Sequence, residues 1–205
     1  MNIGIIGAGN IGATAARLLT QAGHQVVISN GRGPATLLTL AQDIGVRAVT
    51  VEEAAQFGEI VLLAIPFKDY TTLPSASLRD KVVIDAMNYY PQRDGTITFP
   101  QGTSSELVAQ FLGSLRLIKA FNTMESSILG SAGRTDAPAE ERLALFIAGD
   151  DASAKAIVTK LIAEMGFTAV DTGSLHDGGK RQQPGTAVYG QRLTAREAQS
   201  LLQGS

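Results

Sequence analysis

Three glycines near the start of the chain have the spacing of a phosphate-binding turn. They are Gly7, Gly9 and Gly12, and they follow directly on an apolar run at residues 2–6. In such a turn the first glycine permits a tight bend, the second lets the backbone approach a pyrophosphate, and the third lets a helix pack closely on the strand. The N–H groups and the dipole at the start of that helix attract an anion. The spacing therefore predicts a dinucleotide-binding site.

The residues around these glycines have the pattern of a strand–helix–strand unit. Apolar side chains recur at helical spacing up to Ala22, and residues 25–28 are typical of a second buried strand. Asn10 and Ile11 then stand at the start of the helix, where the pyrophosphate would rest. We expect both in the cofactor site.

The end of the second strand indicates which dinucleotide is bound. A site that prefers NAD usually carries an Asp or Glu about 20 residues after the glycines, where it holds the ribose 2′-hydroxyl. Here the strand runs into Ser29, Asn30 and Arg32, without an acid. A hydroxyl, an amide and a guanidinium suit a 2′-phosphate that a carboxylate would repel. We expect these three residues to select NADP(H).

Composition excludes several other functions. The chain of 205 residues has 17 Lys and Arg against 19 Asp and Glu, which gives no basic surface for nucleic acid or an anionic membrane. It has no cysteine, and its two histidines, His24 and His176, lack metal-site spacing, so neither disulfides nor a metal is expected. No apolar run reaches about 18 residues and no basic leader precedes the first strand. We expect a soluble, cytoplasmic protein.

Apolar runs alternate with helical patterns along the chain, which predicts a single α/β domain over residues 1–205. The fold class expected is a Rossmann-type, doubly wound, mostly parallel sheet covered on both faces, with a core over 1–172 and a short C-terminal extension over 173–205. Residues 172–190 show little periodicity and are expected on the surface. The expected strands are 2–6, 25–28, 47–49, 60–65, 82–84, 117–120, 145–148 and 168–170, and the expected helices are 10–22, 34–44, 51–56, 104–113, 152–165 and 194–202.

Further candidate site residues follow the fourth, fifth and sixth expected strands. In open α/β sheets, ligands bind beyond the carboxyl ends of the strands. Pro66, Asn88 and Asn122 all fall at such ends. Each also has a purely structural explanation as a strand terminator or turn former, but three at corresponding ends favour a site. Tyr89 and Tyr90 would point in opposite directions in a strand, so at most one is expected to flank a bound ring.

Five segments together resemble the coenzyme F420-dependent NADP oxidoreductase family, of which the ferric-reductase domains of the STEAP proteins are relatives. The segments are Gly7–Gly12, Ser29–Pro34, Ala64–Phe67, Lys119–Thr123 and Leu145–Asp151. The resemblance implies a Rossmann-type fold and a hydride transfer between NADP(H) and the deazaflavin F420. It implies that Ala64, Ile65 and Pro66 pass under the adenine-side ribose and the pyrophosphate. It also implies that Asn88 and Asn122 approach the nicotinamide, and that the protein forms a homodimer, to which Val188 and Tyr189 would contribute.

No Ser/His/Asp, Cys/His or paired-carboxylate group stands out, so no catalytic residue is assigned. This suits hydride transfer between two redox cofactors, which needs alignment of the rings more than a protein acid or base. Two alternatives remain open. One is an NADPH-dependent reductase of another acceptor: a flavin, a ferric chelate, an imine or a carbonyl compound. The other is a non-catalytic NADPH-binding sensor that acts through a partner.

Overall fold

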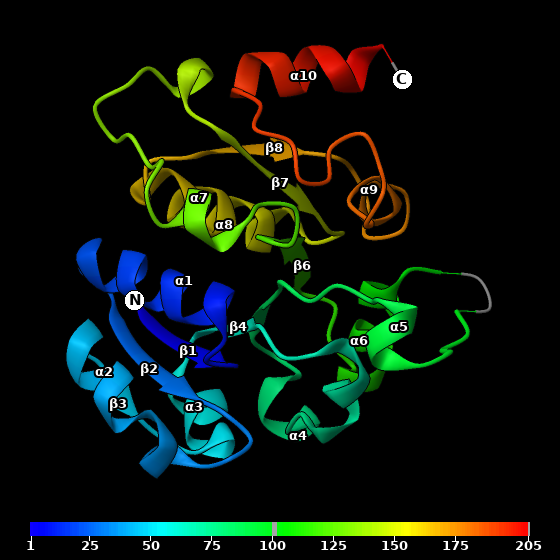
Figure 1. Ribbon diagram of the computed structural model, residues 1–205. Coiled ribbons are helices and arrows are strands. Elements are labelled where there is room, and N and C mark those ends of the chain that lie inside the picture. The colour runs from blue at the N-terminus through cyan, green and yellow to red at the C-terminus, as the bar shows by residue number, and fades with distance from the viewer. Residues whose placement is uncertain (100–101, 205) are drawn as a thin grey trace.

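The computed structural model describes residues 1–99 and 102–204 and confirms the α/β fold (Figure 1). One eight-stranded sheet runs through the molecule, with helices on both faces. Its strands are β1 (Asn2–Ile6), β2 (Gln25–Ser29), β3 (Arg47–Ala48), β4 (Ile60–Leu63), β5 (Val82–Asp85), β6 (Leu117–Ala120), β7 (Ala144–Ala148) and β8 (Thr168–Asp171). The longer helices are α1 (Asn10–Gln21), α2 (Leu38–Ile44), α3 (Val51–Phe57), α6 (Ser104–Leu112), α8 (Ala152–Glu164) and α10 (Ala195–Gln203).

The strand order is β3-β2-β1-β4-β5-β6-β7-β8, and every neighbouring pair is parallel except β6 and β7. The order reverses at β1, where Ile3 pairs with Val26 of β2 on one side and with Ile60 of β4 on the other. The reversal opens a crevice at the carboxyl ends of β1 and β4, the usual place for a ligand in a doubly wound sheet. The antiparallel pairing has a local reason: the chain between β6 and β7 lacks the long helix that normally carries a crossover.

Alternating side chains of each strand enter two separate hydrophobic layers. Ile3 and Ile5 pack with α1, α2 and α8 on one face, whereas Ile6 packs with α3 and α6 on the other. Because both faces are covered, most buried strand residues are apolar, as expected for a parallel sheet. The sheet thereby forms a rigid platform for the loops at its edge.

The C-terminal extension builds a third, smaller layer. α10 packs over β7 and β8, and Val188 is buried beneath it at 3% exposure. Gln182 is fully buried as well. The expectation that residues 172–190 run over the surface therefore holds only in part: Lys180, Arg181 and Gly185 are exposed, whereas Leu175, Gln182 and Val188 are buried. Val188 packs within its own chain, so its side chain is not exposed for the dimer contact expected of it.

Short helices account for most other differences from the expected elements. A helix of about four residues shows no apolar period and escapes detection from sequence. β4 ends at Leu63 rather than Ile65, which leaves Ala64 to Pro66 outside the strand. The expected helix 34–44 begins as a 3₁₀ turn. The additional elements are η1 (Pro34–Leu37), η2 (Phe67–Thr72), α4 (Ser75–Leu78), α5 (Pro91–Asp94), α7 (Ser126–Leu129), η3 (Ala139–Glu141) and α9 (Asp177–Arg181).

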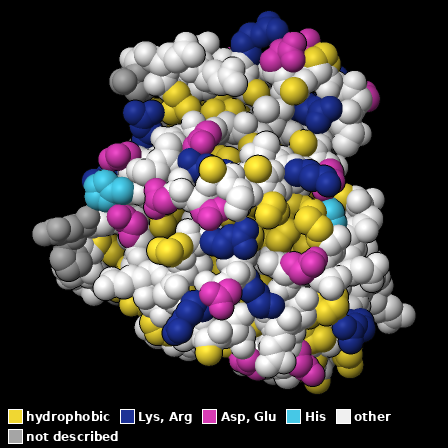
Figure 2. Space-filling view, turned by 180° about the vertical axis from the view of Figure 1, so that it is seen from behind, with side chains coloured by type: hydrophobic (Ala, Val, Ile, Leu, Met, Phe, Trp, Pro, Cys, Tyr) yellow, Lys and Arg dark blue, Asp and Glu magenta, His cyan; other side chains and the backbone are white. Residues whose placement is uncertain are grey.

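The surface shows no concentration of one charge on the face drawn in Figure 2, where basic and acidic side chains are interspersed. This agrees with the net charge of −2. Among the helices of the described chain, none combines the length and the apolar character needed to cross a bilayer.

Candidate functional site

The glycine turn between β1 and α1 has the geometry predicted for it. Gly7 adopts a φ of +111°, and a Cβ there would lie 2.3 Å from the Ala64 carbonyl oxygen. A Cβ on Gly12 would lie 1.8 Å from the Gly7 carbonyl oxygen. A Cβ on Gly9, by contrast, would meet no atom within 4 Å among the residues described. The first and third glycines are thus required by packing, whereas the second faces open space that a ligand can occupy.

The start of α1 is left open to that space. Thr50, Thr103, Asp151 and Thr194 cap α3, α6, α8 and α10 with a side-chain oxygen. α1 has neither a side-chain cap nor an acidic residue in its first turn. The first N–H groups of a helix need acceptors, and its dipole favours an anion. An uncapped helix beside open space is suited to a pyrophosphate.

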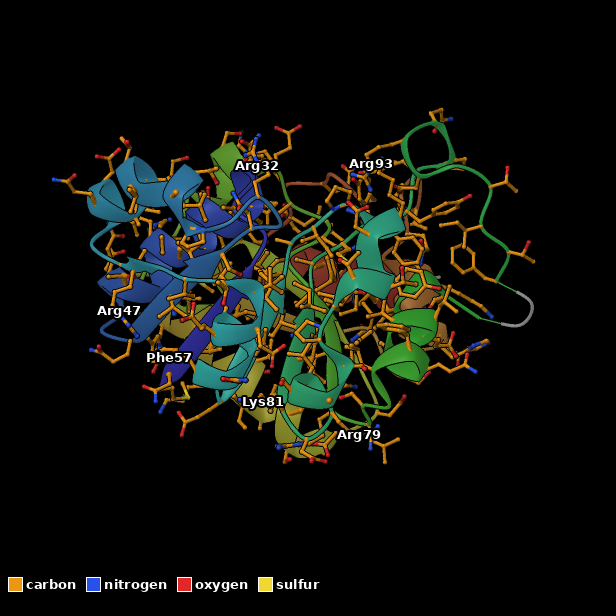
Figure 3. All side chains as sticks on the ribbon, turned by 90° about the horizontal axis from the view of Figure 1, so that it is seen from below. Arg32, Arg47, Phe57, Arg79, Lys81 and Arg93 are labelled. Atoms are coloured by element: carbon orange, nitrogen blue, oxygen red, sulfur yellow. The ribbon has the colours of Figure 1, made fainter. Side chains whose placement is uncertain are left out.

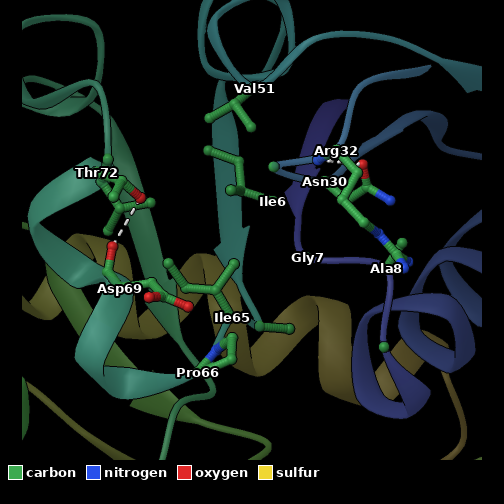
Figure 4. Close-up of a pocket in the computed structure, with 14 residues that line it drawn as sticks. Ile6, Gly7, Ala8, Asn30, Arg32, Val51, Ile65, Pro66, Asp69 and Thr72 are labelled. Carbon is green, nitrogen blue, oxygen red and sulfur yellow. Dashed lines mark hydrogen bonds between the residues drawn. The ribbon is translucent and has the colours of Figure 1, made fainter. Parts of the chain in front are cut away.

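A cleft of about 800 Å³ extends from this turn across the crevice between β1 and β4 (Figure 4). We call it the nucleotide cleft. Its apolar lining suits an adenine ring, and its polar groups lie on opposite sides, with Arg32 and Asn30 facing Asp69 and Thr72. It is lined by Ile6, Gly7, Ala8, Gly9, Asn30, Gly31, Arg32, Val51, Ala64, Ile65, Pro66, Asp69, Thr72 and Leu73.

Arg32 lies in the turn that follows β2, and the backbone N–H of Arg32 stabilises this turn. This N–H donates to Asn30 Oδ1 at 3.0 Å, and Asn30 Nδ2 donates to Thr36 Oγ1 at 3.0 Å. The Arg32 side chain is exposed and forms no ion pair within residues 1–99 and 102–204. A free guanidinium at this position can bind two oxygens of a 2′-phosphate.

The structure corrects the expectation that Ser29 binds the cofactor. This residue is fully buried, and its Oγ donates to the Ile5 carbonyl at 3.0 Å. As the last residue of β2 its side chain points into the sheet layer rather than toward the cleft. Its hydroxyl stabilises the pairing of β1 and β2 and does not reach a bound phosphate.

A second cavity, of about 360 Å³, lies further along α1. We call it the inner cavity. Asn10 and Ile11 line it directly after Gly9, so it adjoins the nucleotide cleft at the helix start. The described residues around it are Asn10, Ile11, Ala86, Asn88, Tyr90, Phe121, Asn122, Met124, Glu125, Ser126, Ser127 and Tyr189. The structure therefore brings together, in two adjoining spaces, every expected site residue except the packing residue Gly12 and the buried Ser29.

Asn88 and Asn122 form a reciprocal pair across the ends of β5 and β6. Asn88 Nδ2 donates to the Asn122 carbonyl at 2.7 Å, and Asn122 Nδ2 donates to Asn88 Oδ1 at 3.1 Å and to the Gln182 carbonyl at 2.8 Å. Asn122 is 4% exposed, yet its Oδ1 has no partner among the described residues. Buried acceptors are normally hydrogen-bonded. Among the described residues, Asn122 Oδ1 is therefore an unpaired acceptor next to the wall of the inner cavity.

The turn that carries Asn122 is strained. Phe121 has a φ of +65°, and it is the sole residue other than glycine with a positive φ in the described chain. This conformation costs roughly 1–3 kcal/mol for a bulky side chain and concentrates at functional sites. The buried Phe121 ring holds it in place. The strain identifies the end of β6 as a site where geometry matters more than local stability.

A buried ion pair lies beneath the Asn88 loop, and the sequence did not reveal it. Lys119 Nζ lies 3.5 Å from Asp85 Oδ2 and donates to the Met87 carbonyl at 3.0 Å. Asp85 also accepts from Ser105 Oγ at 2.5 Å and from the Met87 N–H at 2.9 Å. Lys119 and Asp85 are both fully buried. Together they fix the backbone that leads into Asn88.

The comparisons with known proteins agree with this geometry. Over 95% of both chains, the protein is 30% identical to the hypothetical protein SMa0349 from Sinorhizobium meliloti, with a TM-score of 0.82. Residues 2–89, which include the whole glycine turn and Arg32, match the family described as NADP oxidoreductase coenzyme F420-dependent. Over these residues the chain resembles this family. The description of that family names NADP, which agrees with the open glycine turn and the exposed Arg32.

Two further proteins are similar to this chain. It is 29% identical over 175 residues to the metalloreductase STEAP3 of Rattus norvegicus, a match that covers 84% of this chain and 34% of that protein. The chain thus spans about a third of the length of that curated relative. A protein from Arthrobacter sp. FB24 assigned as an F420-dependent NADP-reductase shares the fold, with 23% identity, coverage of 100% of this chain and 91% of that one, and a TM-score of 0.73.

The residues present fit NADP(H). Gly9 leaves room where a Cβ would otherwise stand, the start of α1 is uncapped, and Asn122 Oδ1 lacks a donor. These three features lie along one path from the nucleotide cleft into the inner cavity. We infer that the pyrophosphate rests on α1 and that the nicotinamide end enters the inner cavity.

Replacing Arg32 by alanine should weaken NADPH binding by about ten- to a hundredfold, because a charge-assisted hydrogen bond contributes about 1.5–3 kcal/mol. NADH lacks the 2′-phosphate, so its dissociation constant should stay unchanged. Calorimetric titration of both nucleotides measures the effect. Arg47→Ala is the matched control, since Arg47 stacks over Phe57 and lines neither the nucleotide cleft nor the inner cavity (Figure 3). Equal losses for NADPH and NADH would contradict the role given to Arg32.

Proposed function

We propose that this protein transfers a hydride between NADPH and a second redox cofactor, and that this cofactor is the deazaflavin F420. The observation that carries the proposal is the inner cavity, which adjoins the nucleotide cleft at the start of α1 and into which the nicotinamide end is inferred to reach. The description of the family names the same coenzyme. A planar acceptor ring entering this cavity would meet the nicotinamide at the carboxyl ends of β5 and β6.

In this proposal the protein contributes binding and alignment. The bound nicotinamide supplies the hydride, and the start of α1 holds the pyrophosphate. Asn122 Nδ2 donates to Asn88 Oδ1, and this pair fixes the wall of the inner cavity against which the nicotinamide end would lie. Of the described residues that line the inner cavity, Glu125 is the one carboxylate, and none is a histidine or cysteine. Alignment of two rings can supply much of the rate enhancement without a nucleophile.

The proposal is tested by following the absorbance of F420 under anaerobic conditions with NADPH and the purified protein. We expect enzyme-dependent reduction of F420, with one NADPH consumed for each F420 reduced and a much slower reaction with NADH. Heat-inactivated protein gives the background rate. Tight NADPH binding without F420 reduction above this background would overturn the assignment of F420.

The same assay separates the alternative functions. Free flavin, a cyclic imine, an aldehyde and ferric citrate replace F420 in parallel reactions. The likeness to a metalloreductase is the reason for including the ferric chelate. Reduction of one of these compounds in preference to F420 would make it the acceptor class. Failure of every acceptor, together with tight NADPH binding, would favour a sensor.

A further inference from the structure

Two tyrosine hydroxyls meet at the inner cavity, from parts of the chain that are far apart in sequence. Tyr90 precedes α5, and Tyr189 belongs to the C-terminal extension. Their hydroxyl groups are hydrogen-bonded to each other, and both residues line the cavity. The neighbouring Tyr89 is turned away and packs against Phe67 and Phe99. Of the two adjacent tyrosines, Tyr90 therefore lines the inner cavity and Tyr89 does not.

Both hydroxyls are held in place by contacts outside the cavity. The Arg93 guanidinium stacks over the Tyr90 ring at 5.0 Å and is itself paired with Asp94 at 2.8 Å. On the other side, the N–H of Gly190 donates to the Thr123 carbonyl at 2.9 Å. The half-buried Tyr189 is therefore anchored beside the end of β6, next to the strained Phe121.

The hydrogen count of the pair leaves one donor unused. Two phenols carry two hydroxyl hydrogens, and their mutual hydrogen bond uses one of them. Neither hydroxyl has another partner within residues 1–99 and 102–204. Burial raises the pKa of Tyr189, and its hydrogen bond with Tyr90 raises that pKa further, so the phenol stays protonated at neutral pH. The pair thus offers an O–H donor on the wall of the inner cavity.

We propose that the Tyr90–Tyr189 pair is a catalytic hydrogen-bond donor, which stabilises the negative charge that develops on a nitrogen or oxygen of the acceptor during hydride transfer. This inference rests on the proposed function. As the C–H bond of the reduced nicotinamide breaks, its electron pair forms the new C–H bond of the acceptor. The acceptor's π electrons move to the conjugated heteroatom, which takes a proton from solvent. NADPH is oxidised and the acceptor is reduced.

The pair therefore defines the chemical class of the acceptor. A donor fixed where charge develops acts on the transition state more than on the ground state. It is useful to a compound whose hydride-accepting carbon is conjugated with C=N or C=O, such as a deazaflavin, a flavin, an imine or an aldehyde. It gives no comparable advantage with a ferric chelate, which accepts single electrons at the metal.

The test compares Tyr90→Phe, Tyr189→Phe and the double variant, with Tyr89→Phe as the matched control. Tyr89 bears the same hydroxyl but bonds to Gly95 and Ile97 away from the cavity. Each single variant retains one hydroxyl, so we expect its kcat to fall about tenfold, and that of the double variant about a hundredfold, the effect of losing a transition-state donor. KM for the acceptor and the dissociation constant of NADPH should change less than about twofold, and Tyr89→Phe should match the wild type.

A second readout does not depend on turnover. With ¹³Cζ-labelled tyrosine, the NMR signals of Tyr90 and Tyr189 should shift when F420 is added to the protein loaded with NADP⁺, whereas the Tyr89 signal should not. Unshifted Tyr90 and Tyr189 signals would overturn the inference. So would a double variant with the wild-type kcat, or one that changes KM alone, which is the signature of a structural role.

The outcomes also separate this inference from the proposed function. If the wild type reduces F420 and the double variant has the same kcat, the inference is overturned and the proposed function stands. Reduction of a flavin, imine or aldehyde instead of F420, slowed in the double variant, replaces the acceptor and supports the inference. A wild-type protein that reduces ferric citrate alone, or none of these compounds, overturns both.

Discussion

Replacing Gly9 by valine should abolish NADP(H) binding and leave the protein folded. A Cβ at this position meets no described atom within 4 Å, so the side chain fits the unliganded fold. The same side chain would fill the space into which the start of α1 directs its N–H groups. Losing even two charge-assisted hydrogen bonds costs about 3 kcal/mol or more, which weakens binding more than about a hundredfold. Calorimetric titration with NADP⁺, alongside circular dichroism, measures both parts of the prediction.

The neighbouring glycine provides the contrast. Gly12→Val should destabilise the fold itself, because its Cβ would lie 1.8 Å from the Gly7 carbonyl oxygen. We expect a loss of helical signal or a sharply lower melting temperature in this variant, but not in Gly9→Val. If Gly9→Val binds NADP⁺ as tightly as the wild type, the pyrophosphate lies elsewhere.

Replacing Lys119 by methionine should destabilise the protein by about 3–5 kcal/mol, because it leaves the Asp85 carboxylate buried without its counter-charge. For a chain of this size that corresponds to a fall in melting temperature of roughly 6–20 °C. Thermal unfolding at neutral pH followed by circular dichroism gives the value. The Met87 carbonyl also loses its donor, so NADPH binding should weaken even where the variant remains folded.

The double variant Asp85→Leu/Lys119→Met separates charge from packing. Replacing both members of a buried ion pair by apolar residues removes the unpaired charge and often restores stability. We expect the double variant to melt above Lys119→Met alone. A double variant that loses as much as the sum of the two single changes would show that the ion pair acts through its hydrogen bonds and not through its charge.

The central strands were predictable because they are buried on both faces and therefore form short apolar runs, whereas the edge strands β3 and β8 are only partly buried. The glycine turn was predictable for a related reason, since sterics at Gly7 and Gly12 leave few other residue types. Ser29 could not be assigned correctly in the same way. Its identity suits a phosphate, but whether the last residue of a strand points to the cleft or into a layer depends on where that strand ends.

The buried polar groups escaped prediction because their partners come from distant elements. Asp85 and Lys119 are charged residues in apolar runs, and only the pairing of β5 with β6 places them side by side. Gln182 lies in a segment without apolar period, yet its carbonyl accepts from Asn122 and its side chain donates to Thr172. Such contacts are tertiary, and no local sequence pattern predicts them. The same holds for the meeting of Tyr90 and Tyr189.

The position of β1 in the sheet has a consequence for how the chain folds. β1 precedes β4, one of its two partners, by two strands, three α-helices and a 3₁₀ turn. Closing so long a loop lowers the entropy of the chain before the strand pairing can form, and topologies dominated by distant contacts fold slowly. During synthesis an edge of β1 therefore stays unpaired until β4 has emerged. Its apolar residues, the same ones that later support the nucleotide, are the part of the nascent chain most in need of protection from aggregation.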